Sequence, residues 1–348
     1  MYQESYDNSG LQVGDYSMEL NGGLVTLDVT EEVLNEAIGL GVNLIVTHHP
    51  VIFGGIKSLT GRNLSERVIM KAIKNDIAIY AVHTNIDAAE NGVNGKICEK
   101  LELEKCRILE PLESALKKLV VFVPLSHADK VREALFGNGA GQVGNYDSCS
   151  FNLEGKGTFR GGDDTNPFVG ETGSMQTEEE VRIETIFPAH EKGRVIGAML
   201  QAHPYEEVAY DIYSLDNKYQ KVGMGMLGEL KKEMKEEAFL QMLKEKFDVD
   251  CIRHTALLGK QIKKVAVSGG AGSFLLRKAI SSGADIFVSG DFKYHQFFDA
   301  EERIIIADIG HFESEQFTRE LFYELLTKNF PTFAVHLSDV NTNPIKYF

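Results

Sequence analysis

Two adjacent histidines, His48 and His49, follow an apolar segment of the sequence and stand directly before Pro50. The apolar segment, residues 43–47 (NLIVT), is too short for a helix and rich in β-branched residues, so it predicts a buried strand that the proline ends. A single histidine beside an apolar run is most often a core residue with a hydrogen-bonded ring. Two at one strand end both need partners, and neutral imidazole is the commonest protein ligand for a transition metal. We therefore interpret His48 and His49 as the nucleus of a metal site.

Four further predicted strands also end in side chains that bind metals or carry protons. These side chains are Asp28, His83 with Asp87, Asp291 with His295, and His311 with Glu315. Ligands bind at the carboxyl ends of the strands in α/β sheets, so the pattern predicts one cleft lined from both halves of the chain. His311 and Glu315 are spaced to share one face of a helix, although Glu313 competes with Glu315 for this role. Three imidazoles and two carboxylates suit two metal ions of borderline softness, and a carboxylate such as Asp87 can bridge them.

Strands and helices that alternate in both halves of the chain would position these residues. In the first half we expect strands at 24–27, 43–47 and 77–82, with a helix capped by Thr30 after the first strand. In the second half we expect strands at 265–267, 286–288, 304–307 and 332–337. This alternation is typical of a largely parallel α/β sheet.

The segment between the two halves follows a different pattern. Its expected elements are strands at 118–123, 182–187 and 208–215, and helices at 128–136 and 195–200. This repeated β-α-β order suggests a separate ferredoxin-like unit. Residues 139–144 (GAGQVG) formally fit the dinucleotide motif G-x-G-x-x-G, but they follow a helix and precede a strand, the reverse of what such a site needs. We therefore reject this motif as a cofactor site.

Several of the polar residues at the strand ends also have a plain structural explanation. For Asp28 and Asp291, capping of a helix is a slightly better explanation than a role in metal binding or proton transfer. For His83 and His295, a role in supporting the metal ligands or capping a helix is as good an explanation as a role as proton carrier.

A glycine-rich segment, residues 268–273 (SGGAGS), follows one predicted strand and starts a helix. That geometry offers backbone N–H groups to a phosphate, and the residues that would bind it are Gly269, Gly270 and Gly272. The segment lacks the lysine and the full spacing of a P-loop, so a structural turn is the better interpretation and phosphate binding is the alternative.

Length and composition restrict the class of protein. A chain of 348 residues with 43% hydrophobic and 25% charged residues predicts an ordinary globular protein of two domains. The 36 basic against 51 acidic residues, a net charge of −15, argue against nucleic acid or a membrane surface as a partner. The four cysteines are scattered without a C-x-x-C pair, and no apolar run is long enough to span a membrane. We therefore expect a cytoplasmic protein with reduced thiols.

Five motifs, taken in order along the chain, make the sequence similar to a known family. They are DNSGLQVGD, VTHHPVIF, HTNID, SGDFKYHQ and GHFESE. Together they resemble the Nif-three-like dinuclear metal-centre family, whose members are also known as GTP cyclohydrolase I type 2 homologues. The resemblance covers essentially the whole chain, and the combined set of motifs is very specific.

The resemblance implies a discontinuous, two-half α/β metal-binding domain with mostly parallel sheets and an inserted ferredoxin-like (PII/CutA-like) α+β domain. The expected segments are 1–115 and 221–348 for the two halves and 116–220 for the insert. The implied ligands of two divalent metal ions are His48, His49, Asp87, His311 and Glu315. The donor set suits zinc, iron or manganese without choosing among them. The resemblance further implies a toroidal homohexamer whose metal sites face an internal cavity.

Two functions agree with these expectations. The favoured one is a metal-dependent hydrolase, GTP cyclohydrolase I type 2-like, that acts on a nucleotide-like or other small heterocyclic substrate. Two metal ions would activate water, His83 or His295 would pass protons, and the glycine turn would hold a phosphate. The alternative is a metal-binding scaffold or regulatory protein in which the insert senses a small molecule and no turnover occurs.

Overall fold

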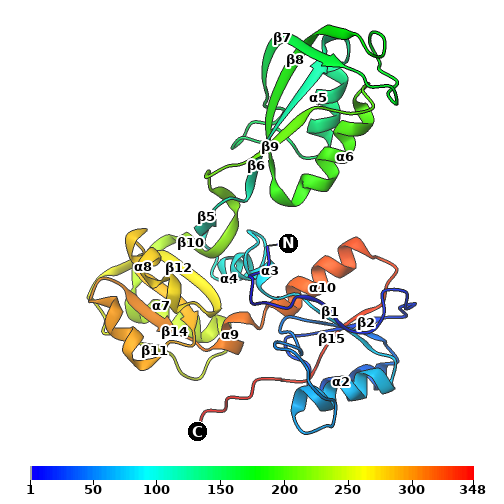
Figure 1. The fold of residues 1–348 in the computed structure, drawn as a ribbon. Helices are drawn as coiled ribbons and strands as arrows, with labels where there is room; N and C mark the ends of the chain where they lie inside the picture. The colour runs from blue at the N-terminus through cyan, green and yellow to red at the C-terminus, as the bar shows by residue number, and fades with distance from the viewer. Residues whose placement is uncertain (1) are drawn as a thin grey trace. The chain divides into compact units, whose positions relative to one another are not determined.

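The computed structural model describes residues 2–348, a mixed α/β protein whose strands form three sheets in that part of the chain. The chain folds into two compact units (Figure 1). The first contains Met1–Pro111 and Gln220–Phe348, and the second contains Leu112–Tyr219. The boundaries expected from the sequence lie slightly later, at 115/116 and 220/221. None of the helices within residues 2–348 combines the length and apolarity that a membrane span requires.

The first sheet of the first unit has five strands in the order β1-β4-β3-β2-β15. Its strands are β1 (Gly10–Val13), β2 (Gly23–Thr26), β3 (Leu44–Thr47), β4 (Ala78–Ala81) and β15 (Val335–Leu337). Four of them run parallel, while β1 pairs antiparallel with β4. Because β15 comes from the C-terminal segment, the first and last parts of the chain build this sheet together.

Helices cover both faces of this sheet because side chains alternate along its buried strands. The covering helices are α1 (Glu31–Leu40), α2 (Leu64–Lys74) and α10 (Thr318–Asn329). Ile45 of β3 packs in the core with α1 and α2, whereas its neighbour Val46 packs against Phe322 of α10. Helix α1 begins as predicted, because the Thr30 hydroxyl accepts a hydrogen bond from the Val33 N–H at 3.3 Å.

The second sheet of this unit has six strands in the order β11-β14-β13-β12-β10-β5. Its strands are β5 (Glu104–Leu112), β10 (Tyr219–Lys235), β11 (Arg253–His254), β12 (Gln261–Ala271), β13 (Ile286–Gly290) and β14 (Ile305–Asp308). The central three, β12, β13 and β14, run parallel, and β10 and β11 join them antiparallel. The associated helices are α3 (Thr84–Asp87), α4 (Val93–Lys100), α7 (Glu236–Phe247), α8 (Leu276–Ser281), α9 (His311–Glu315), and the 3₁₀ helices η3 (Ser273–Leu275) and η4 (Tyr294–Ala300). Parallel strands in both sheets therefore carry the predicted polar residues at their carboxyl ends.

The second unit is a four-stranded antiparallel sheet with two helices on one face. Along the chain its elements are β6 (Leu116–Pro124), η1 (Leu125–His127), α5 (Ala128–Gly137), β7 (Phe151–Arg160), β8 (Met175–Pro188), η2 (Ala189–Glu191), α6 (Lys192–Ala202) and β9 (Tyr210–Ser214). The strand order is β7-β8-β6-β9, with every neighbouring pair antiparallel. Val121 of β6 and Ile183 of β8 pack against Val131 of α5 and Val195 of α6 to form the core. The glycine motif at 139–144 lies between α5 and β7, as the sequence predicts.

Strands β5 and β10 lie next to each other where the chain leaves and re-enters the first unit. Gly223 lies against Glu110 and Gly228 lies against Leu103, since a Cβ added at either glycine would collide with those residues. Residue numbers therefore rise along β10 as they fall along the neighbouring segment, so the two strands run in opposite directions. Their ends at Pro111 and Gln220 are therefore neighbours that a short turn can connect.

We predict that a chain in which Pro111 is joined to Gln220 through a short glycine-containing turn still folds and still binds metal. The connection replaces the second unit by a β-hairpin turn and leaves the core of the first unit intact. Circular dichroism and metal analysis of the shortened protein, beside the full chain, measure the outcome. Loss of both the fold and the metal would show that residues 112–219 belong to the structural core.

Candidate metal centre

Histidines and carboxylates from both halves of the first unit converge at one place. Their donor atoms form three groups, each with all atoms within 4.8 Å of one another: His48 with Asp87 and Glu315, His49 with His311 and Glu315, and His48 with His49 and His83. Side chains from both halves of the chain therefore meet in one cluster.

The parallel sheets explain why these residues meet. His48 and His49 follow β3, and His83 follows the neighbouring strand β4. His311 begins the short helix α9 directly after β14, and Glu315 lies one turn later on the same face, with His311 Nε2 and Glu315 Oε2 3.1 Å apart. Each side chain thus reaches the cluster from the carboxyl end of a buried strand.

The outward-facing nitrogen of each ring has a hydrogen-bond partner. The Nδ1 partners are Val82 O for His48 (2.9 Å), Asp28 for His49 (2.7 Å), Asp7 for His83 (2.7 Å) and Asp291 for His311 (2.7 Å). An oxygen acceptor fixes the proton on Nδ1 and leaves the Nε2 lone pair free to bind a metal.

The inward-facing Nε2 atoms of three histidines surround the Glu315 carboxylate. His49 Nε2 lies 3.0 Å from Oε2, and His48 Nε2 lies 3.6 Å from Oε1. His48 Nε2 is also 3.6 Å from Oδ1 of Asp87. Glu315 is therefore shared between two donor groups, one at each carboxylate oxygen, whereas Asp87 belongs to one group. The sequence pattern suggested a carboxylate such as Asp87 as the bridge, and the geometry favours Glu315 instead.

The donor set has the chemistry of a metal site. His48 Nε2, Asp87 Oδ1 and Glu315 Oε2 are buried, and none of them has a hydrogen-bond partner outside the cluster. Within residues 2–348 no lysine or arginine forms an ion pair with the carboxylates of the cluster or with the aspartates behind the rings. Unpartnered buried polar atoms are costly, and a divalent cation would satisfy all three. Imidazole together with carboxylate suits zinc, iron or manganese, so the residues fit a metal.

Comparison with known proteins agrees with this geometry. The sequence profile of the Duf34/NIF3 (NGG1p interacting factor 3) family matches residues 1–344. The chain belongs to this family. A Halalkalibacterium halodurans protein named "GTP cyclohydrolase 1 type 2 homolog" is 42% identical over 346 residues, which cover 98% of this chain and 93% of that protein. A Bacillus subtilis protein of the same name is 41% identical over 352 residues, with coverages of 99% and 94%. The resemblance that the five sequence motifs indicate is confirmed.

Solved structures also resemble this NIF3-family chain. The crystal structure of a Bacillus cereus protein related to NIF3 matches with a TM-score of 0.86 and 42% identity over 100% of this chain and 94% of that one. A Staphylococcus aureus protein matches with a TM-score of 0.77 and 32% identity, covering 99% and 93%.

Carboxylates raise the basicity of the two partly exposed rings in the NIF3-family cluster. Burial alone lowers the pKa of His49, but hydrogen bonds and charges from Asp28 and Glu315 outweigh it and raise the pKa to about 10. Burial likewise lowers the pKa of His311, and Glu315 together with Asp291 raises it to about 9. Without metal, these rings hold protons where a metal would otherwise bind.

Burial and the neighbouring charges shift the pKa values of Asp87, Glu315 and His48 in different directions. Burial raises the pKa of Asp87 to about 7, partly opposed by the charge of His48. Burial also raises the pKa of Glu315, yet the three surrounding histidines bring it well below its ordinary value. For His48, burial lowers the pKa, and Asp87 and Glu315 outweigh that effect and raise it. One carboxylate therefore stays ionised while the other titrates near neutrality.

We predict that metal binding to this site releases protons. The pKa values of His49 and His311 lie above pH 8, so both rings carry a second proton at pH 8 in metal-free protein. A metal ion needs the Nε2 lone pair, so its binding at pH 8 should release about two protons from these rings. Affinity should rise with pH up to about 10 and then level off, because the competing protons are gone.

Calorimetric titration of metal-free protein with Zn²⁺ in buffers of different ionisation enthalpy counts the released protons. Glu315→Gln is the control, since it removes the shared donor and the binding heat with it. Binding of Zn²⁺ at pH 8 without proton release would show that these rings are neutral before the metal arrives.

The glycine segment predicted as a phosphate-binding alternative lies behind Glu315. Gly269 N–H donates to Asn94 Oδ1 at 2.9 Å, and Gly270 N–H donates to Ser314 Oγ at 2.9 Å. These N–H groups are occupied within the protein and are not available to a phosphate. A Cβ on Gly270 would collide with Glu315 Oε1, and one on Gly272 would collide with Ser289. The segment supports the shared carboxylate, which matches the structural-turn interpretation.

Two residues that the sequence pattern singled out, His295 and Glu313, lie outside the cluster. His295 is exposed on η4 beside Tyr294, and within residues 2–348 it belongs to no group of metal-donor atoms. Glu313 turns away from the cluster and accepts a hydrogen bond from Asn343 at 2.9 Å. The capping interpretation of Asp28 and Asp291 is wrong. Both aspartates accept a hydrogen bond from a histidine ring, and the caps of the helices that follow are Thr30 and Lys293.

Asp7 is a functional candidate that the sequence reasoning missed. Its buried carboxylate accepts hydrogen bonds from His83 Nδ1, from the Thr84 hydroxyl at 2.6 Å and from the Ser9 hydroxyl at 2.8 Å. Although burial opposes ionisation, these hydrogen bonds and the charge of His83 lower the pKa of Asp7 to about 2. Asp7 stands in the DNSG motif, whose position before any predicted strand gave no reason to pair it with His83.

Proposed function

We propose that this protein is a hydrolase that uses two divalent metal ions to act on a nucleotide-like or other small heterocyclic substrate. The observation that carries the proposal is the pair of donor groups that share Glu315, with Nε2 atoms free to bind on both sides. His48 and Asp87 would hold one ion, and His49 and His311 the other. When bound, two such ions supply Lewis acidity and a water molecule activated at neutral pH.

The division of the cluster between buried and accessible residues supports catalysis over a purely structural site. The His48 side chain is 0% exposed and Glu315 4%, whereas His311 is 33% exposed. Structural metal sites are closed by four protein ligands, while catalytic sites keep a position open. The His49–His311 side of the cluster is where a substrate would reach it.

His83 and Asp7 form a proton-transfer pair beside the metal ligands. The His83 ring lies 5.3 Å from the His48 ring and 5.6 Å from the His49 ring, centre to centre. Burial lowers the pKa of His83 even though Asp7 opposes this, so the ring is neutral at pH 7 and can accept a proton on Nε2. The ionised Asp7 holds the tautomer and would stabilise the imidazolium that forms. We assign His83 the role of general base. The role of proton carrier for His295, which lies on η4 outside the donor groups, stays a prediction.

Two exposed aromatic rings next to His83 support a flat substrate. The Phe53 ring lies 6.1 Å from the His83 ring, and the Tyr6 ring lies 6.3 Å from Phe53. Exposed rings of this kind stack on heterocyclic bases. The name of the relatives, GTP cyclohydrolase 1 type 2 homolog, agrees with a purine-like substrate.

Metal analysis followed by turnover tests the proposal. Protein purified without added metal should bind about two equivalents of zinc, iron or manganese. The loaded protein should then hydrolyse at least one compound of a panel of GTP, other nucleotides, pterins and small cyclic amides. Loaded protein that turns over none of them would favour the metal-binding scaffold or regulator instead.

We further propose a cytoplasmic homohexamer in which residues 112–219 are an inserted ferredoxin-like module of the PII/CutA type. The β-α-β-β-α-β order and the antiparallel sheet β7-β8-β6-β9 support this assignment. Native mass spectrometry of the full chain tests the assembly, since a hexamer of 38.7 kDa chains is readily distinguished from a monomer or dimer.

A further inference from the structure

The second unit contains a hollow on the sheet face that its helices do not cover. Val121 and Ile183 point to the helices, so their neighbours Phe122 and Arg182, which pair across β6 and β8, point to the open face. Glu180, two residues before Arg182, lies on this face as well. These residues belong to the lining of a cavity of about 550 Å³, within the size range of small-molecule sites.

Glycines in β7 create the hollow. Gly155 pairs with Glu180 across the sheet, and Gly157 pairs with Glu178, so both lie on the open face. A Cβ on Gly157 would collide with Oε2 of Glu180, whereas a Cβ on Gly155 would meet nothing within 4 Å. The missing side chains leave space above the sheet and let the Glu180 carboxylate lie against the backbone of β7.

Aromatic rings form the walls of this hollow. The Tyr205 ring lies 6.1 Å from Phe159 and 6.2 Å from Phe168, which come from β7 and from the loop after it. The backbone N–H of Asn166 donates to Glu206 Oε1 at 2.9 Å, which ties that loop to the segment carrying Tyr205. Rings from separate segments are thus held around one space.

A buried histidine holds Tyr205 in place. His203 Nδ1 accepts the backbone N–H of Tyr205 at 3.1 Å, so its proton lies on Nε2, which donates to Phe122 O at 2.9 Å. Burial lowers the pKa of His203, in agreement with a neutral ring in this role. Through His203, these two hydrogen bonds anchor the segment that carries Tyr205 to β6.

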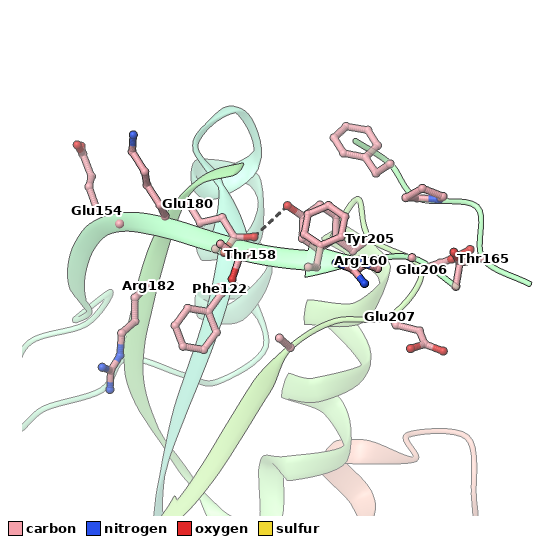
Figure 2. A pocket seen from close by; sticks show the side chains of 18 of the residues that line it. Phe122, Glu154, Thr158, Arg160, Thr165, Glu180, Arg182, Tyr205, Glu206 and Glu207 are labelled. Atoms are coloured by element: carbon pink, nitrogen blue, oxygen red, sulfur yellow. Dashed lines mark hydrogen bonds between the residues drawn. The ribbon is translucent and has the colours of Figure 1, made fainter. Parts of the chain in front are cut away.

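A carboxylate forms the base of the hollow. Glu180 is 8% exposed, and its Oε1 accepts a hydrogen bond from the Tyr205 hydroxyl at 2.9 Å (Figure 2). Within residues 2–348 no lysine or arginine lies within ion-pair distance of Glu180, and Arg182 pairs with Glu184 instead. A buried carboxylate without a cation is costly, so a positively charged group from outside would stabilise it.

We propose that this cavity binds a small organic amine, whose protonated nitrogen pairs with Glu180 and whose apolar body packs among Phe159, Phe168 and Tyr205. Aromatic rings around a carboxylate are the arrangement that recognises organic cations, because the ring faces attract positive charge. The ammonium group donates to the Glu180 carboxylate beside the Tyr205 hydroxyl, and the glycines of β7 leave room for the carbon skeleton. The site lies entirely within residues 112–219 and does not depend on the metal centre.

The test uses the full chain and arylalkylamines paired with neutral analogues: phenethylamine with 2-phenylethanol, and tryptamine with tryptophol. Calorimetry measures affinity, and protein NMR identifies the residues whose signals shift. At least one amine should bind about tenfold more tightly than its alcohol and shift signals of Tyr205 and Phe159. Glu180→Gln should weaken amine binding by about tenfold or more and abolish the preference over the alcohol.

Two further variants separate loss of the site from loss of the fold. Glu179→Gln makes the same charge change at an exposed position of β8 outside the cavity lining and should bind the amine as the parent chain does. Gly155→Val adds a β-branched side chain at an open strand position, so the unit should fold while the side chain narrows the cavity and weakens amine binding. Equal affinity for every amine and its alcohol, or unchanged amine binding by folded Glu180→Gln or Gly155→Val protein, would overturn the proposal.

Discussion

Glu315→Gln should remove both metal ions at once, whereas His48→Ala and His49→Ala should each remove about one equivalent. Glu315 belongs to both donor groups, with Oε1 facing His48 and Oε2 facing His49. Glutamine keeps the shape of the side chain but replaces an anionic oxygen by an NH₂ group that cannot bind a metal. The two histidines belong to different groups around that carboxylate, so each alanine variant leaves the other group complete.

Elemental analysis of the purified variants measures the metal content, and circular dichroism shows whether each variant is folded. Glu313→Gln is the matched control, because Glu313 is also buried on α9 but pairs with Asn343 outside the cluster. It should retain both ions. Unchanged metal in a folded His48→Ala, His49→Ala double variant would remove these residues from the site.

The sequence predicts the strands that carry the metal ligands because those strands are buried on both faces. Residues 44–47 (LIVT) and 305–308 (IIAD) are short runs rich in β-branched residues, and each lies between helices. Their length and composition favour central strands of a covered sheet, and polar residues that follow such strands are expected at its carboxyl edge. The local pattern thus places His49 and His311 each at a carboxyl edge. Their strands belong to different sheets and 262 residues separate the two histidines, so only the packing of the two sheets brings them together.

The strands that the sequence reasoning missed carry no such signal. β7 (FNLEGKGTFR) is exposed at most positions and contains two glycines, so no apolar alternation marks it. β5 (EKCRILEPL) contains a proline, and β10 (YQKVGMGMLGELKKEMK) is interrupted by glycines. Pairing with a neighbouring strand of the sheet, rather than local preference, makes them strands.

The local sequence pattern also does not predict which carboxylates accept hydrogen bonds from the Nδ1 atoms of the histidines. Asp28 and Asp291 stand beside helices in the sequence, so a cap is the simplest local explanation. The choice between capping a helix and orienting His49 or His311 depends on which strands are neighbours, which only the folded sheet decides. A carboxylate at the end of the strand next to a histidine strand is the signal that could have found these pairs.

His83→Ala should keep both metal ions and lower hydrolytic turnover by about 10²-fold or more, because it removes the proton acceptor and none of the shared ligands. His83 lies beside the cluster, and its Nδ1 is held by Asp7 at 2.7 Å. Metal analysis and turnover on the best substrate of the panel are measured on the same preparation. Folded His83→Ala protein with full turnover would remove the base from the mechanism, and loss of metal would make His83 a ligand.

Asp7→Asn should also lower turnover, although the His83 ring stays in place. An amide at this position no longer fixes the His83 tautomer or stabilises the imidazolium. A neutral base works in its deprotonated form, so turnover rises with pH through the pKa of His83. The Asp7 anion raises that pKa against the effect of burial, so its removal should move the rise to lower pH. A merely structural role for Asp7 would change the folded fraction and leave the pH profile in place. Asp15→Asn, the same substitution at an exposed carboxylate nearby in the sequence, should leave both rate and profile unchanged.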